Sequence, residues 1–155
     1  MEILKIIVSG LIGTMLMTLF SYVCGQLFSK EFGEPYLLNK LLEQWPVGHQ
    51  GNKPKNEFLL GWVIHLFIGF LFALFLYTYF AWKDSFGWRE SMSNLFVAGY
   101  LGLVLGLLGV VGWVVLLKMH KSPPKLALPE FYIQLVVAHV VFGLGTVLGF
   151  GLLIR

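Results

Sequence analysis

The chain has 155 residues, of which 57% are hydrophobic and 12% charged, with a formal net charge of +3 at neutral pH. Its mean hydropathy is +0.79, whereas an ordinary soluble domain carries about 25% charged residues. The composition therefore indicates a membrane protein that contacts the lipid bilayer. Basic residues form no patch with interleaved aromatic residues, which argues against nucleic acid as a partner. The single cysteine, Cys24, excludes an internal disulfide or a multi-cysteine metal site.

Four uncharged apolar stretches divide the chain. They cover residues 6–29, 58–82, 91–117 and 131–154, and no proline lies within any of them. Each exceeds the roughly 20 residues that a helix needs to cross a bilayer, and continuous apolarity excludes the alternating strands of a membrane barrel. The sequence predicts one all-α domain over residues 1–155, an up-and-down bundle of four transmembrane helices.

Small residues mark the faces on which these helices are expected to pack. They recur every three or four positions, which lets helix backbones approach closely in lipid. In the first stretch they include Gly10, Thr14 and Thr18, and in the third Gly99, Gly102, Gly106, Gly109 and Gly112.

The first loop contains a short amphipathic pattern over residues 34–45, with Pro35 in its first turn. Apolar residues at three-to-four spacing predict a helix that lies in the membrane interface or packs as a cap on the bundle. We expect His49, later in this loop, and His120, after the third stretch, to be solvated.

Two histidines lie inside the second and fourth stretches, and each is followed four residues later by glycine, as His65 with Gly69 and His139 with Gly143. No aspartate, glutamate, lysine or arginine shares these stretches. An ionisable side chain at membrane depth is a functional-site hypothesis by default, because its burial in lipid is costly. The two motifs are 74 residues apart, which suggests a tandem duplication of a helical hairpin.

Three interpretations of the pair stay open. Each imidazole could hydrogen-bond to a neighbouring helix, with a backbone carbonyl or one of four side chains as partner, namely Thr14, Thr18, Ser21 or Tyr100. In a square bundle the second and fourth helices are diagonal, so His65 and His139 could instead be the axial ligands of haem b, with Gly69 and Gly143 admitting the macrocycle. A proton or small-solute path is the third interpretation, weakened by the absence of carboxylates from the stretches. Two histidines without a third ligand or a base argue against a zinc site or an enzyme.

Lysine and arginine placement predicts the orientation. If the four stretches alternate in direction, seven lysines fall in the first and third loops, against four basic residues at the termini and in the middle loop. The positive-inside rule then places loops 1 and 3 in the cytoplasm.

Several short motifs accompany the two His-x-x-x-Gly sequences. They are Gly10-Leu-Ile-Gly-Thr14-Met-Leu-Met-Thr18, Glu34-Pro-Tyr-Leu-Leu, Ser122-Pro-Pro-Lys and Phe131-Tyr-Ile-Gln-Leu-Val-Val-Ala-His139. With these motifs the chain resembles a group of small, uncharacterised four-helix membrane proteins of bacteria. The resemblance implies a location in the bacterial inner membrane and no particular activity.

Together these observations predict a non-enzymatic accessory or ligand-holding bundle. We expect it to act as a homo-oligomer or with other membrane subunits. A bis-histidine haem electron carrier is the alternative function, and permeation of protons or small solutes is the third.

Overall fold

The computed structural model describes residues 2–43, 57–83, 91–120 and 123–153. These residues form five helices, which are α1 (Glu2–Phe28), α2 (Glu34–Glu43), α3 (Glu57–Trp82), α4 (Ser91–Met119) and α5 (Leu128–Leu153). All except α2 are long and apolar enough to cross a membrane. The prediction of an all-α membrane bundle with four spans is confirmed.

The helix limits follow the apolar stretches closely, with one informative difference. Helix α5 begins at Leu128, three residues before the uncharged stretch, so Pro129 lies inside its first turn. Pro35 has the same place in α2. Proline is accepted there because the first N–H groups of a helix have no partner within the helix.

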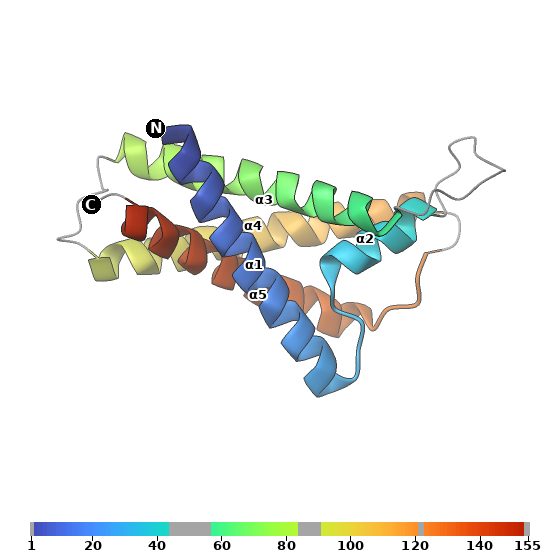
Figure 1. The fold of residues 1–155 in the computed structure, drawn as a ribbon. Helices are drawn as coiled ribbons and strands as arrows, with labels where there is room; N and C mark the ends of the chain where they lie inside the picture. Colours follow the sequence, from blue (N-terminus) through green and yellow to red (C-terminus); the bar gives the residue numbers. More distant parts are fainter. Residues whose placement is uncertain (1, 44–56, 84–90, 121–122, 154–155) are drawn as a thin grey trace.

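The four long helices do not form a closed ring. Helix α5 packs closely against both α1 and α4, α3 packs against α1, and α3 and α4 barely contact each other. Figure 1 shows α1 crossing obliquely over α5, with the start of α1 and the end of α5 at the same end of the bundle. The second and fourth spans, α3 and α5, are thus diagonal. We call the sparsely packed line between α3 and α4 the α3–α4 seam.

Helix α2 caps one end of the bundle and lies against α3. Its side chains Leu37 and Leu41 are almost fully buried, and Asn39 Oδ1 accepts a hydrogen bond of 2.6 Å from the backbone N–H of Gly61 in the first turns of α3. The predicted amphipathic helix is confirmed, in the packed arrangement rather than the interfacial one. Its apolar face is buried because the bundle end offers apolar side chains to cover it.

Two expectations about single residues near this end have different outcomes. His120 is buried, and its Nε2 lies 3.1 Å from the carbonyl oxygen of Leu41. The expectation that it is solvated is therefore wrong, because α2 folds over the end of α4. His49 lies outside the described residues.

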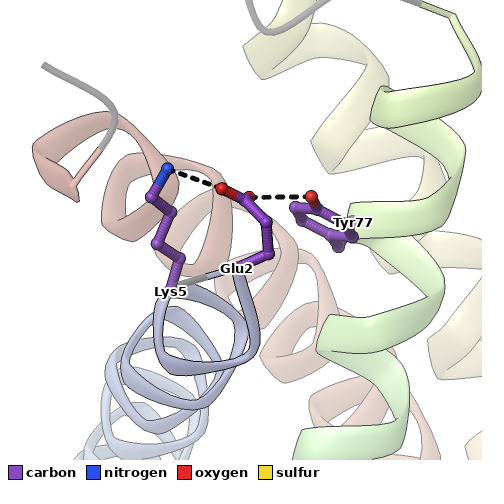
Figure 2. Close-up of polar contacts among 3 residues, drawn as sticks. All are labelled: Glu2, Lys5 and Tyr77. Atoms are coloured by element: carbon purple, nitrogen blue, oxygen red, sulfur yellow. Dashed lines mark hydrogen bonds and ion pairs between the residues drawn. The ribbon is translucent and has the colours of Figure 1, made fainter.

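At the opposite end, a polar cluster ties the start of α1 to the end of α3 (Figure 2). Glu2 Oε1 lies 3.0 Å from Lys5 Nζ, and the Tyr77 hydroxyl donates to Glu2 Oε2 over 2.8 Å. Exposed ion pairs stabilise little, about 0 to 1 kcal/mol. The cluster therefore connects the start of α1 to the end of α3 and contributes little to stability.

Glycines bring several helices into close contact. A Cβ added at Gly10 would lie 2.9 Å from Ala73 Cβ, and one at Gly106 would lie 2.8 Å from Val136 Cα. A Cβ at Gly102 would overlap the carbonyl oxygen of His139. These positions hold α1 against α3 and α4 against α5, because any larger side chain there would push the backbones apart.

The third-stretch glycines do not all behave alike. A Cβ at Gly99 would make only ordinary contacts, 3.9 Å from Leu144 and Val140, and one at Gly112 would meet nothing within 4 Å. The glycine row of α4 therefore packs closely over its middle turns and leaves the contact with α5 toward its end. Gly112 faces open space there.

Candidate ligand cavity

A cavity of about 200 Å³ lies inside the bundle and is lined by residues of all five helices. Its polar or titratable lining residues are Thr14, Glu34, His65 and His139. No lysine or arginine is among the described residues that line it. The rest of the lining is apolar or glycine, so the few polar groups decide what the cavity can bind.

His65 reaches the cavity from α3 and is only 6% exposed. Its Nε2 lies 3.0 Å from Thr18 Oγ1 on α1. The Thr18 hydroxyl donates its proton to the carbonyl oxygen of Thr14 over 2.8 Å, so toward His65 the Thr18 oxygen acts as acceptor. His65 is thereby assigned as the tautomer with a proton on Nε2. This contact is one of the interhelical hydrogen bonds considered in the first of the three interpretations.

His139 reaches the same cavity from α5 and is 5% exposed. Its Nδ1 lies 2.8 Å from the carbonyl oxygen of Leu135. A carbonyl can only accept, so Nδ1 carries the proton and Nε2 carries a lone pair. Among the described residues Nε2 has no hydrogen-bond partner. Gly109 of α4 lies against this edge of the ring, where an added Cβ would be 3.3 Å from Nε2.

The two histidines therefore differ in a way that their shared sequence motif does not suggest. The helix facing His65 presents a hydroxyl, Thr18, whereas the helix facing His139 presents glycines, including Gly106 and Gly109. Glycine has no side chain that could hydrogen-bond to the imidazole. The Nδ1–H group of His139 therefore donates to a carbonyl of its own helix, that of Leu135. His65 therefore donates to a facing helix and keeps its lone pair on Nδ1, whereas His139 donates to its own helix and keeps its lone pair on Nε2.

Glu34 is the residue that sequence reasoning missed. It is 2% exposed, its Oε1 accepts hydrogen bonds from the Ser21 hydroxyl at 2.7 Å and the Gln134 amide at 3.4 Å, and its Oε2 is buried without a partner among the described residues. Burial raises the pKa of the Glu34 carboxyl to about 7, an effect that the hydrogen bonds from Ser21 and Gln134 oppose.

Helix α2 explains how a carboxyl reaches this depth without lying in a span. Gln134 lies six residues inside α5, about 9 Å from its start at 1.5 Å per residue. The folding back of α2 carries Glu34 inward to meet it. The sequence held a signal: Glu34 shares the buried face of α2 with Leu37, Leu38 and Leu41. The absence of carboxylates from the spans, used above against a proton path, thus does not extend to the cavity.

The remaining predicted site residues separate into two groups. Gly69 and Gly109 line the cavity beside the histidines, and a Cβ at Gly69 would overlap the side chain of Thr14. Gly143 packs instead against Ala98 and Gly102 of α4, outside the cavity lining. Gly10, Gly99, Gly102 and Gly106 likewise lie away from the cavity, between helices.

This geometry does not fit a haem held by two Nε2 atoms. Both histidines face one cavity from diagonal helices, as the haem hypothesis requires, but Nε2 of His65 is bound to Thr18. The cavity of about 200 Å³ is also smaller than the roughly 300–1,000 Å³ of sites for drug-sized ligands. The described residues contain no group of three or more histidine, cysteine, aspartate or glutamate side chains that could hold a metal ion.

Fold and cavity together define an integral membrane helical bundle with a small, largely apolar internal cavity. No family model matches the chain, and no solved structure matches it. A segment of 49 residues is 49% identical to prolipoprotein diacylglyceryl transferases of Vibrio campbellii and Vibrio parahaemolyticus, named for phosphatidylglycerol. The segment covers 31% of this chain and only 17% of each transferase.

Proposed function

We propose that this integral membrane protein is a non-enzymatic, ligand-holding bundle that works as a homo-oligomer or beside other subunits of a membrane complex. The observation that supports this most is the unpaired Nε2 of His139 in a cavity that also contains Glu34. Buried polar groups are nearly always hydrogen-bonded. An acceptor without a partner beside an open volume is therefore suited to a ligand.

The hydrogen-bond directions favour holding over catalysis. Thr18 and His65 lie at the distance of a nucleophile and its base. However, the Thr18 proton is directed to the Thr14 carbonyl, and His65 donates rather than accepts. The lone pair of His65 is then on Nδ1 and does not face the Thr18 hydroxyl, so the two residues are not arranged as a nucleophile and its general base.

The likeness to the Vibrio transferases agrees with a ligand that is drawn from the bilayer. Those enzymes are named for phosphatidylglycerol, a membrane lipid. The matched segment is short, so it supports only one part of the proposal, namely that the ligand comes from the lipid bilayer.

Native mass spectrometry of the full chain, purified from membranes in mild detergent, tests the proposal. The wild-type protein should keep a small non-protein mass that His139→Phe loses. Leu148→Phe is the matched control, because Leu148 is half exposed on the same helix, and this variant should keep the mass. Wild-type protein that carries only its own mass would contradict the proposal.

Bis-histidine haem b is the second candidate, supported by the exposure of both imidazoles to one cavity. It requires His65 to leave Thr18 and the helices to separate. A haem protein would show a Soret band, and His65→Ala or His139→Ala would each change it. Colourless protein without iron, from cells supplied with haem precursor, would exclude this candidate.

A further inference from the structure

We infer that the cavity is filled from the lipid through the α3–α4 seam, and that its ligand is an uncharged lipid whose hydroxyl group donates to Nε2 of His139. Long-chain alcohols are the simplest members of this class. The inference rests on the proposed ligand-holding function and specifies the route and the chemistry of the ligand.

The route follows from the side chains at the mouth of the cavity. Leu108 of α4 and Ile68 of α3 both line the cavity, yet they are 58% and 38% exposed. Helices α3 and α4 barely contact each other at the seam between them. Both helices are apolar enough to cross a membrane, so their exposed surfaces face lipid chains rather than water.

Gly112 strengthens this assignment. It lines the cavity, it is exposed, and a Cβ there would meet nothing within 4 Å. The middle of the same glycine row is packed against α5, as at Gly102 and Gly106. Gly112 therefore takes part in no close contact between helices. Because it has no side chain, it leaves an opening in the cavity wall at this turn of α4.

The polar chemistry of the ligand follows from the tautomers. His139 presents a lone pair at Nε2, since its proton is on Nδ1, so the ligand must supply a hydrogen-bond donor. No lysine or arginine is among the described residues that line the cavity, so the negative charge of a phosphate would be buried without a partner, at high cost. An uncharged hydroxyl meets both conditions.

Size limits how much of the ligand enters. A volume of about 200 Å³ accepts the hydroxyl end and the first part of a chain, and the remaining chain would extend through the seam into the bilayer. The apolar side chains Leu108, Ile68, Phe72 and Phe142 that line the cavity suit this part of the ligand, because burying methylene groups is favourable at about 0.8 kcal/mol each.

Trp113 provides a probe, since it lines the cavity and is buried. The protein would be placed in phosphatidylcholine nanodiscs and titrated with a long-chain alcohol that carries bromine next to the hydroxyl-bearing carbon. The matched bromoalkane without the hydroxyl is the control ligand. Bromine quenches tryptophan at contact distance, and the difference between wild type and Trp113→Phe isolates the signal of Trp113.

We expect saturable quenching of Trp113 by the alcohol, with an apparent affinity about three- to tenfold above that of the bromoalkane, as one neutral hydrogen bond provides. His139→Phe should remove this preference. Gly112→Phe should abolish quenching by both ligands by filling the opening. Val111→Phe, on the exposed neighbour outside the cavity lining, should change neither.

Equal affinity of alcohol and bromoalkane for the wild-type protein would overturn the assignment of a hydroxyl ligand and leave ligand holding intact. Quenching that is linear, or unchanged in Gly112→Phe, would overturn entry through the seam. Because these outcomes come from added probes, they are separate from the retained mass that tests the proposed function.

Discussion

The hydroxyl of Ser21 on α1 lies 2.7 Å from Oε1 of Glu34 on α2, and this contact joins a transmembrane helix to the short helix that folds back over it. Both residues are almost completely buried. Since the carboxyl is held away from water, its protonation state is coupled to the packing of α2.

The first prediction concerns pH. The pKa of Glu34 rises from 4.5 to about 7 on burial, so the folded protein holds this proton more tightly than the unfolded chain. The resulting stabilisation is complete below about pH 4.5 and is lost as the pH rises through about 7, with a total on the order of 3 kcal/mol. Thermal unfolding of the protein in detergent across this range should show the loss.

Glu34→Gln is the matched control for the pH effect. Glutamine keeps the shape of the side chain and an oxygen that accepts from Ser21, but it does not titrate. The variant should unfold at a temperature that varies less between pH 4.5 and 7. A wild type and a variant with the same pH dependence would show that Glu34 does not couple to folding.

The second prediction concerns the hydrogen bond between His65 and Thr18. In a double-mutant cycle with His65→Phe and Thr18→Val, the coupling energy should be about 0.6 kcal/mol and at most about 1.7 kcal/mol, as for other intramembrane hydrogen bonds. His139→Phe combined with Thr18→Val serves as the control pair, with a coupling near zero. A larger coupling in the control pair would contradict the assigned partners.

The third prediction concerns helix packing at Gly106. A Cβ at this position would lie 2.8 Å from Val136 Cα and 3.2 Å from His139 Cβ, so Gly106→Leu should separate α4 from α5. The expected cost is about 1 to 3 kcal/mol, the usual range for overpacking, measured as unfolding in detergent. Val111→Leu, at an exposed site on α4, should be nearly neutral. Equal losses of stability in Gly106→Leu and Val111→Leu would show that Gly106 does not lie at a helix contact that stabilises the bundle.

The fourth prediction is topological. The lysine and arginine count predicts loops 1 and 3 in the cytoplasm and both termini on the other side. The start of α1 and the end of α5 do lie at one end of the bundle (Figure 1). A reporter that is active only outside the cytoplasm should be active when fused after Arg155. Activity only of a cytoplasmic reporter would reverse the orientation and place α2 on the outer side.

The sequence alone determined the four spans, since helices in lipid must satisfy their own backbone hydrogen bonds and need about 20 apolar residues to do so. It also singled out His65 and His139, because ionisable groups are rare at that depth. Local composition was sufficient for both conclusions. Both conclusions depend on the free-energy cost of placing polar groups in lipid, and the residues of each stretch alone determine that cost.

Only the tertiary structure decided what the histidines do and what accompanies them. The two His-x-x-x-Gly motifs are alike in sequence, yet His65 meets Thr18 and His139 meets Gly109, because the facing helix supplies the partner. In the sequence Glu34 is only the first residue of the amphipathic pattern in the first loop, whereas in the structure it is buried against Ser21. Hydrogen-bond partners and cavities arise from which helices pack together, and contacts between distant segments are not encoded in the hydropathy of either one.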